Sequence, residues 1–435
     1  MKIKKITGIF LTTLTAASLV FSPIISHAEG EKADFSSACI DNYEGTSPKN
    51  QISAPQLLSE AGIVMDASTG TILYEKNSKD KHFPASITKL MTVLLTLENC
   101  KLNETVKFSH DAVYSIEFGS ANIGIKEGEE LSLKNSLYGI LLASANEVSY
   151  AVGEHVAGGN ISDFSNMMNE KATQIGCLNS HFCNPHGLHD DDHYTCAYDM
   201  ALITKNLLKY NTFRIIIGTK TYTIPPTNIT PEARVLNNTH KMLKNNRFEY
   251  EGVEGGKTGF TNQALNTLVT CAKRDGLELI AVSMYGNQTH YPDTATLFNY
   301  GFNNYKSINI ADEEKRIDNT NAAAFSSNNF LNENEDLFSI DEDAKMAIPK
   351  NTSLSDLASS VDSSNGEFNV SYSLDNKELS KVKLNLTNVS NNSYTFKNNI
   401  KSNAFNPFVY ILIVIAVIIF GLLILLKSIK RKRRR

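Results

Sequence analysis

The chain contains 435 residues, of which 42% are hydrophobic, and carries a formal net charge of −4 at pH 7. This apolar content is ordinary, and the length is sufficient for one large domain and a smaller one. A large domain can build its own core, so no disulfide framework is required. The sequence does not reveal any pairing among the six cysteines, which are Cys39, Cys100, Cys177, Cys183, Cys196 and Cys271.

The first residues have the layout of a secretory signal peptide. Lysines at positions 2, 4 and 5 precede an apolar run, and small residues at Ser26 and Ala28 flank the expected cleavage point. Proline and polar residues interrupt the run, which favours a cleaved signal over an amino-terminal membrane anchor. We expect residues 1–28 to direct export and the polar residues 29–55 to form a leader.

A second apolar run, "FVYILIVIAVIIFGLLILL" at residues 408–426, contains no charged residue and is about long enough to cross a bilayer as a helix. In residues 427–435, which follow it, seven of nine residues are basic, and such clusters stay on the cytoplasmic side. The sequence predicts a single-pass cell-membrane protein with extracytoplasmic domains and a cytoplasmic C-terminus. A basic tail on a slightly acidic chain indicates anionic lipid, and no nucleic acid, as its partner.

The large domain, residues 56–305, begins and ends with predicted strands. Two strand-like runs, Ile63 to Asp66 and Thr71 to Tyr74, flank a Ser-Thr-Gly turn. Helical patterns follow, and strands return in "YEGVEGGKTGF" and "NTLVTCAKRDGLELIAVSMYG", where Asp275-Gly276 predicts a hairpin turn. This order indicates an α+β domain whose antiparallel sheet brings together the two ends of the domain.

The chain changes character after residue 305. Residues 311–336 are polar and rich in asparagine, as in a linker. Beyond them, apolar and polar residues alternate in "FNVSYSL" (368–374) and "VKLNL" (382–386), which predicts half-buried strands. We expect residues 306–400 to hold a linker and a small β-rich domain.

Positions 83–92, "FPASITKLMT", place a serine and a lysine three residues apart where a buried helix is predicted to begin. Residues three apart on a helix share a face, so Ser86 and Lys89 would be neighbours. Unpaired N–H groups at the amino end of a helix favour a developing negative charge. The pair is a candidate nucleophile and base, although a proline followed by a serine also begins ordinary helices.

Two further short motifs accompany this pair. "SAN" occupies residues 144–146 within the helical region, and "KTG" occupies residues 257–259 on the first of the late strands. Each tripeptide is uninformative alone, because a polar break between helices or the end of a strand would explain it. The order, spacing and structural setting of all three motifs together indicate a serine acyl-transfer site.

With these motifs, the chain resembles the penicillin-recognising serine enzymes, and within them the D-alanyl-D-alanine carboxypeptidases of the low-molecular-mass penicillin-binding proteins, the S11 peptidases. The stretches that carry the resemblance are "PASITKLMT", "LLASANEVSYAVGEHVAG", "FSNMMNEKATQIG", "HFCNPHGL" and "VEGGKTGFTNQA". They cover residues 56–305 closely and the small β-rich domain loosely. Departures are modest: alanine stands at 145 where glycine is frequent, and Cys177, Cys183 and Cys196 occupy positions that are not usually cysteine.

The resemblance implies an α+β fold of the β-lactamase/transpeptidase type, with an antiparallel sheet flanked by helices. It implies an enzyme that removes the terminal D-alanine from peptidoglycan stem pentapeptides through an acyl-enzyme on Ser86. β-Lactam antibiotics would be covalent inhibitors, and no cofactor would be needed.

The resemblance also assigns the catalytic roles. Ser86 would be the nucleophile, and Lys89 can be its base only when neutral, whereas an ordinary lysine has a pKa near ~10.4. Burial and the second cation of Lys257 would both lower that pKa. Ser144 would relay a proton toward the leaving amine.

Substrate binding is assigned in the same way. Lys257 would face the terminal carboxylate of the substrate and Asn146 would hold its amide. Gly259 would let the substrate backbone lie along the strand, and the N–H groups of Ser86 and Phe260 would form an oxyanion hole, at about 3 kcal/mol per donor. The expected substrate-binding residues are Asn146, Lys257, Thr258, Gly259 and Phe260.

The segment "HFCNPHGLHDDDHYTC" gathers four histidines, two cysteines and three aspartates between residues 181 and 196. A metal site is one interpretation. Its spacings match no familiar zinc pattern, however, and the resemblance places the segment in a structural loop. We therefore expect no metal.

Two other functions remain as alternatives. A class A β-lactamase would add a glutamate with an asparagine four residues later, and no glutamate between Asn146 and Lys257 has one. A non-enzymatic penicillin-sensing receptor would normally need a signalling domain, whereas nine residues follow the predicted membrane segment. Both are expected less than the carboxypeptidase.

Overall fold

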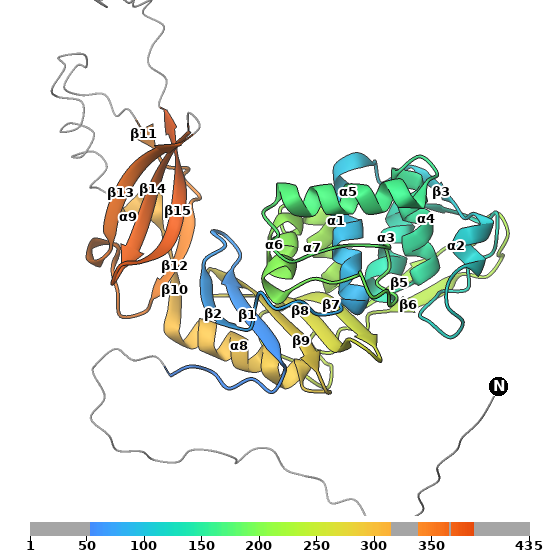
Figure 1. The fold of residues 1–435 in the computed structure, drawn as a ribbon, viewed down its shortest axis with the longest axis horizontal. Coiled ribbons are helices and arrows are strands. Elements are labelled where there is room, and N and C mark those ends of the chain that lie inside the picture. The colour runs from blue at the N-terminus through green and yellow to red at the C-terminus, as the bar shows by residue number, and fades with distance from the viewer. Residues whose placement is uncertain (1–52, 315–337, 365–366, 387–435) are drawn as a thin grey trace, which may run out of the picture. The chain divides into compact units, whose positions relative to one another are not determined.

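The computed structural model describes residues 53–314, 338–364 and 367–386 (Figure 1). All of them belong to one compact unit, residues 52–435, whereas the other unit, residues 1–51, lies outside the described residues. The predicted signal peptide, most of the leader, the membrane segment at 408–426 and the basic tail at 427–435 also lie outside them. No helix in the described part of the chain is long and apolar enough to cross a membrane.

A five-stranded antiparallel sheet forms the centre of the large domain (Figure 1). Its order is β2-β1-β9-β8-β7, so the strand pair from the start of the domain is hydrogen bonded to the triplet from its end. The sequence prediction of this arrangement is confirmed. The strands are β1 (Ala61–Asp66), β2 (Ile72–Lys76), β7 (Val253–Thr261), β8 (Leu265–Arg274) and β9 (Leu277–Gly286).

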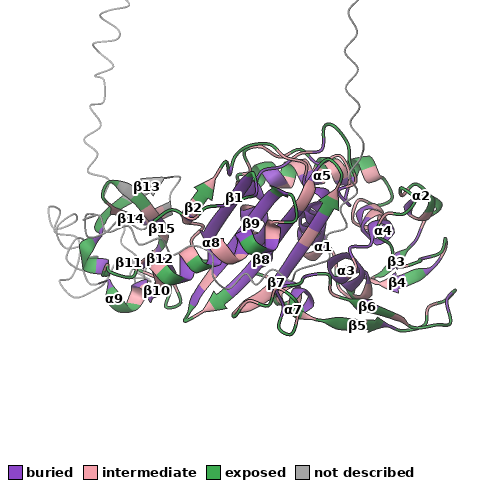
Figure 2. Cartoon of the chain, turned by 90° about the horizontal axis from the view of Figure 1, so that it is seen from below, coloured by how far each residue is buried: buried purple, intermediate pink, exposed green. Residues whose placement is uncertain are grey.

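The sheet is covered on both faces, and its middle strands are buried (Figure 2). Ile63 and Met65 of β1 pack into the cluster formed with the helical region, while Val64 packs into a second cluster with helix α8 (His290–Asn304). Burial on two faces explains why β1 is an unbroken apolar run rather than an alternating one.

The helical region lies between β2 and β7 in the sequence. Its helices are η1 (Ala85–Thr88), α1 (Lys89–Asn99), α2 (His110–Tyr114), α3 (Leu133–Leu142), α4 (Asn146–Val156), α5 (Ile161–Gln174), α6 (Ala197–Leu207) and α7 (Asn211–Gly218). Two small two-stranded sheets accompany them, β3 (Thr105–Lys107) with β4 (Glu130–Ser132), and β5 (Thr221–Ile224) with β6 (Arg234–Asn237). Helix α1 is central to this region, since eight of its eleven residues are buried.

The described residues after α8 are mostly strands. A four-stranded sheet has the order β11-β15-β14-β13, and β10 pairs with β12. Val370, Tyr372 and Leu384 are buried in its core, which confirms the predicted alternation. The elements are β10 (Tyr305–Asn309), α9 (Ile310–Glu313), β11 (Phe338–Ser339), β12 (Lys345–Pro349), η3 (Leu354–Asp356), β13 (Ala358–Ser364), β14 (Glu367–Leu374) and β15 (Lys377–Leu386).

Asp293, in the first turn of α8, binds the segment that leads into strand β1. Its carboxylate accepts hydrogen bonds from the backbone N–H of Leu58 at 2.9 Å and of Ser59 at 2.7 Å. The side chain is only 2% exposed, so water cannot replace these bonds.

We predict that Asp293→Asn lowers the free energy of unfolding by about 2 kcal/mol, because an amide turns one acceptor oxygen into a donor that faces N–H groups. Denaturant titration of the full chain measures this. Asp80→Asn is the control, since Asp80 is exposed. Equal stability of the two variants would contradict a structural role for the Asp293 carboxylate.

Candidate active site

Ser86 lies in the short 3₁₀ helix η1, and the α-helix begins only at Lys89. The sequence predicts Ser86 at the amino end of a buried helix, and the structure agrees, since η1 runs directly into α1, although the first turn is a 3₁₀ turn. The tighter helix repeats every three residues, so Ser86 and Lys89 still lie on one face. Thr267 of β8 holds the turn, because its hydroxyl donates to the Pro84 carbonyl at 2.8 Å.

Lys89 is fully buried, and its Nζ has three oxygen neighbours. They are Ser86 Oγ at 2.9 Å, Asn146 Oδ1 at 2.7 Å and the carbonyl of His186 at 2.6 Å. Burial, followed by the charge of Lys257, holds the pKa of Lys89 well below its ordinary value, while Glu147 acts in the opposite direction.

These contacts suit the neutral amine. A neutral lysine has two hydrogens and one lone pair. Lys89 Nζ donates to Asn146 Oδ1, to the His186 carbonyl and to Ser86 Oγ. When the amine is neutral and its two hydrogens stay on the first two acceptors, its lone pair faces the Ser86 hydroxyl. The surroundings of Lys89 thus hold its amine against the Ser86 hydroxyl.

The loop of residues 181–196, which includes the His186 carbonyl, supports the nucleophile from behind. His193 is buried; its Nδ1 accepts from the N–H of Cys183 at 3.0 Å, and its Nε2 contacts Thr88 Oγ1 at 2.8 Å. Burial lowers the pKa of His193 to about 3, so the ring is neutral and Nε2–H donates to Thr88. The histidine that the sequence raised as a metal ligand is therefore a hydrogen-bonding support.

The second lysine lies on β7. Lys257 is 1% exposed, and its Nζ donates to Ser144 Oγ at 3.0 Å and to the Thr258 carbonyl at 2.7 Å. Burial lowers the pKa of Lys257 to about 7. Ser144 reaches it from the turn between α3 and α4, where its backbone has a φ of +61°. A positive φ is unfavourable for a serine. Here it directs the Ser144 hydroxyl toward Lys257, and strained backbone of this kind is frequent at functional sites.

Helix α4 begins at Asn146, whose amide oxygen is the one bound to Lys89. Its next residue, Glu147, is buried, and Oε1 accepts from the N–H of Ile123 at 2.6 Å. Burial raises the pKa of Glu147, and the adjacent Lys89 acts in the opposite direction.

Strand β7 is an edge strand, and its Lys257–Phe260 segment passes beside the nucleophile turn. A Cβ at Gly259 would lie 2.9 Å from the Ser86 nitrogen, so only glycine permits this approach. Thr258 contacts Thr239 through their hydroxyls at 3.0 Å, and the Phe260 side chain is 60% exposed. The backbone of β7 at Gly259 therefore lies directly against the backbone of the turn that carries Ser86.

The structure thus connects Ser86, Lys89 and Asn146 in one hydrogen-bonded group and Ser144 with Lys257 in another. Sequence reasoning weighed the histidines of the 181–196 loop only as metal ligands, and it did not predict that the His186 carbonyl binds Lys89 or that His193 lies behind the site. The stretch "NPHGL" contained a signal for this contact, because its glycine, Gly187, allows the loop to approach the backbone of Ala85 closely. Thr239 and Glu147 carried no sequence signal.

A serine hydroxyl in contact with a buried lysine, on a helix beside the edge of an antiparallel sheet, is the arrangement of a serine hydrolase. The family model described as D-alanyl-D-alanine carboxypeptidase, of the S11 peptidases, matches residues 48–288. The chain belongs to this family, and the prediction from the three motifs is confirmed.

Individual relatives agree. D-alanyl-D-alanine carboxypeptidase DacF of Bacillus subtilis strain 168 is 35% identical over 257 residues, which span 57% of this chain and 63% of that protein. The D-alanyl-D-alanine carboxypeptidase of Streptomyces sp. strain K15 is 28% identical, over 59% of this chain and 92% of that protein.

Solved structures show the same fold. The Streptomyces K15 DD-transpeptidase has a TM-score of 0.54 and 27% identity, covering 58% of this chain and all of that one. A D-alanyl-D-alanine carboxypeptidase from Mycobacterium tuberculosis H37Rv has a TM-score of 0.53 and 28% identity, over 60% of this chain and 96% of that one. The predicted transpeptidase-like α+β fold is confirmed for the large domain.

Gly187 follows the carbonyl that binds Lys89, and it tests the packing of the site. Its φ is +84°, and a Cβ there would meet the Ala85 carbonyl oxygen at 1.9 Å. Gly158 is the matched control, since its φ is +71° and nothing lies within 4 Å of a Cβ there.

We predict that Gly187→Ala destabilises the protein by at least about 2 kcal/mol more than Gly158→Ala, because both pay for the left-handed backbone but only the first clashes. Thermal and denaturant unfolding of both variants measure the difference. Similar losses would mean that the loop can withdraw from Ala85 at little cost.

Proposed function

We propose that this protein is a serine D-alanyl-D-alanine carboxypeptidase that removes the terminal D-alanine from peptidoglycan stem peptides. The observation that carries the proposal is the 2.9 Å contact between Ser86 Oγ and the Nζ of the buried, low-pKa Lys89. Membership of the S11 family supports the choice of substrate.

Acylation begins with the Ser86 hydroxyl, which attacks the carbonyl carbon of the penultimate D-alanine while its proton passes to Lys89 Nζ. The negative charge on the carbonyl oxygen is stabilised by the N–H groups of Ser86 and Phe260, at about 3 kcal/mol per donor. The approach of Gly259 to the Ser86 nitrogen supports this placement, since it brings β7 beside the attacked carbonyl.

Collapse of the tetrahedral intermediate breaks the peptide bond. The leaving nitrogen takes a proton from the Ser144 hydroxyl, which Lys257 Nζ contacts at 3.0 Å, and free D-alanine departs. The proton that Lys89 took from Ser86 then replaces the one lost by Ser144, so both residues return to their starting forms. Water attacks the Ser86 ester while Lys89 accepts its proton, and Lys89 passes that proton to Ser86 Oγ as the shortened peptide is released.

Substrate recognition uses the remaining residues. The charged Lys257 binds the terminal carboxylate of the peptide, and the peptide backbone adds to the edge of β7 along Lys257 to Phe260. The Oδ1 atom of Asn146 is occupied by Lys89, so its Nδ2 group is the part that donates to the substrate amide. Thr258 directs its hydroxyl toward Thr239 at the border of the site.

β-Lactam antibiotics acylate the same serine in this proposal. The alternatives of a β-lactamase and a non-enzymatic penicillin sensor are less well supported, because the matched relatives are named carboxypeptidases. A β-lactamase would hydrolyse penicillin rapidly, and a sensor would not release D-alanine.

We place the domain outside the cell at the membrane surface. The support is in the sequence, where a signal-like start, an uncharged run at 408–426 and a basic tail at 427–435 favour one orientation.

We predict that the full chain in detergent releases D-alanine from a pentapeptide ending in D-Ala-D-Ala and is labelled by a fluorescent penicillin. Ser86→Ala should abolish both, because the variant has no nucleophile, while its unfolding transition stays within about 1 kcal/mol of the parent. Mass spectrometry of the peptide and of the labelled protein measures both. A folded Ser86→Ala variant that still binds penicillin covalently would refute the assignment.

Substrate recognition by Lys257 predicts a pH dependence. Because burial lowers its pKa to about 7, Lys257 is charged below that pH and neutral above it in the free enzyme. Binding of a carboxylate favours the charged form, so kcat/KM should fall above pH 7 while kcat persists to higher pH. Initial rates across neutral pH measure both constants.

A substrate whose terminal carboxylate is amidated is the control, and it should lack the alkaline fall. Lys257→Met should slow the free-acid substrate by about tenfold to hundredfold more than the amide, since a hydrogen bond to a charged group is worth roughly 1.5 to 3 kcal/mol. Equal losses for both substrates at every pH would mean that Lys257 tunes Lys89 without reading the carboxylate.

A further inference from the structure

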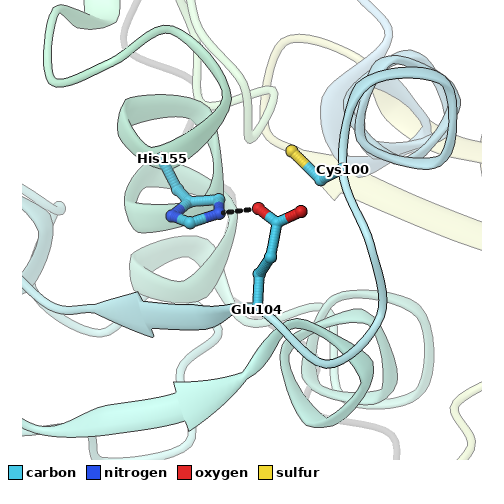
Figure 3. Close-up of side chains that lie close together, drawn as sticks. All are labelled: Cys100, Glu104 and His155. Atoms are coloured by element: carbon cyan, nitrogen blue, oxygen red, sulfur yellow. Dashed lines mark hydrogen bonds and ion pairs between the residues drawn. The ribbon is translucent and has the colours of Figure 1, made fainter.

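A cluster of three metal-ligating side chains lies apart from the active site (Figure 3). Cys100 follows the last residue of α1, Glu104 immediately precedes β3, and His155 is on the last turn of α4. Among the described residues, these three form the one group of His, Cys, Asp or Glu whose ligand atoms all lie within 4.8 Å of one another. The proposed reaction uses none of them.

The side chains are already oriented toward one another. His155 Nε2 lies 2.9 Å from Glu104 Oε2, and the other carboxylate oxygen accepts from the N–H of Lys101 at 2.6 Å. The side chains of His155 and Glu104 are 24% and 37% exposed, so an ion in solution can reach a site that is largely walled by protein. The sulfur of Cys100 faces the same space (Figure 3).

We propose that Cys100, Glu104 and His155 bind Zn²⁺, with a water molecule as the fourth ligand. Thiolate, imidazole and carboxylate are the three side-chain ligands that zinc uses, and three protein ligands leave one position open. Hard cations such as Ca²⁺ and Mg²⁺ prefer oxygen ligands only, and would gain nothing from the sulfur.

The alternative is that His155 and Glu104 form an ordinary ion pair beside an unrelated thiol. A second His–Glu pair in the chain shows what such a pair looks like. His110 and Glu127 also approach to 2.9 Å, but their side chains are 68% and 52% exposed and the group has no cysteine. The cluster at Cys100 differs by its sulfur and by its burial.

Zinc binding has a defined proton balance. The Cys100 thiol releases its proton to solvent and binds as a thiolate, while His155 binds the ion through an Nε2 that carries no hydrogen. Burial and the adjacent Glu104 raise the pKa of Cys100, and a bound cation offsets both effects. Because a thiolate must form, binding should strengthen as the pH rises.

The site would join the far ends of two helices that also meet in the active site. Lys89 at the start of α1 is hydrogen bonded to Asn146 at the start of α4. Cys100 lies beyond the other end of α1, about 16 Å away at the rise of an α-helix. Zinc would therefore stabilise the α1–α4 pair and would not take part in the reaction of Ser86.

The test uses the full chain, purified in detergent under reducing conditions and stripped of metal. Zn²⁺ affinity is measured by competition with a chromophoric chelator, and Co²⁺ is added as a spectroscopic substitute. A thiolate ligand gives cobalt a charge-transfer band in the near ultraviolet that oxygen and nitrogen ligands do not give. Unfolding is followed with and without Zn²⁺.

We expect the parent protein to bind one Zn²⁺, to show the thiolate–cobalt band, and to unfold at a higher temperature with zinc. Cys100→Ser should lose the band and at least about tenfold in affinity, and His155→Gln should lose affinity to a similar extent. Cys183→Ser and His110→Gln are matched controls and should behave as the parent.

Three outcomes would overturn the proposal. Absence of stoichiometric zinc binding would leave an ion pair beside a thiol. A band that survives in Cys100→Ser would place the thiolate elsewhere. A band lost in Cys183→Ser would assign the metal to the 181–196 loop. None depends on D-alanine release, so failure here and failure of the proposed function are distinguishable.

Discussion

The burial of one lysine is the constraint on which the rest of the site depends. Enclosing an ammonium group in protein costs several kcal/mol, so burial lowers the pKa of Lys89 well below its ordinary value. Two acceptor oxygens, from Asn146 and from the His186 carbonyl, fix the orientation of the amine. The lone pair that remains faces Ser86. A surface lysine would satisfy the same sequence motif and would have no such reactivity.

Three separate parts of the chain must therefore arrive together. Helix α1 supplies Lys89, helix α4 supplies Asn146, and the 181–196 loop supplies a backbone carbonyl. The loop approaches closely only because residue 187 is glycine, and His193 holds it against Thr88. Gly187 and the neutral His193 ring do not touch Ser86, yet they fix the loop whose carbonyl orients Lys89.

The second lysine depends on the sheet. Strand β7 lies at the sheet edge, so its Lys257–Phe260 segment can pass beside the nucleophile turn and still present backbone groups to a peptide. The sheet unites strands from both ends of the domain, and this closes the site around Ser86. If Cys100, Glu104 and His155 hold zinc, the ion would brace the ends of α1 and α4 that lie farthest from this site.

The sequence by itself determined the family and the principal chemical groups, because three motifs at wide spacing in a fixed order are specific even when each is weak. It also determined several of the strands, since the alternation in residues 368–374 and the apolar run at Ile63 to Met65 each record what covers their faces. Only the tertiary structure decided that η1 is a 3₁₀ turn, that the His186 carbonyl binds Lys89, and that Cys100 meets His155. The contact of Lys89 with the His186 carbonyl joins residues 97 positions apart, and that of Cys100 with His155 joins residues 55 positions apart. Such contacts leave no periodicity or local composition in a sequence, so they appear only when the chain is folded.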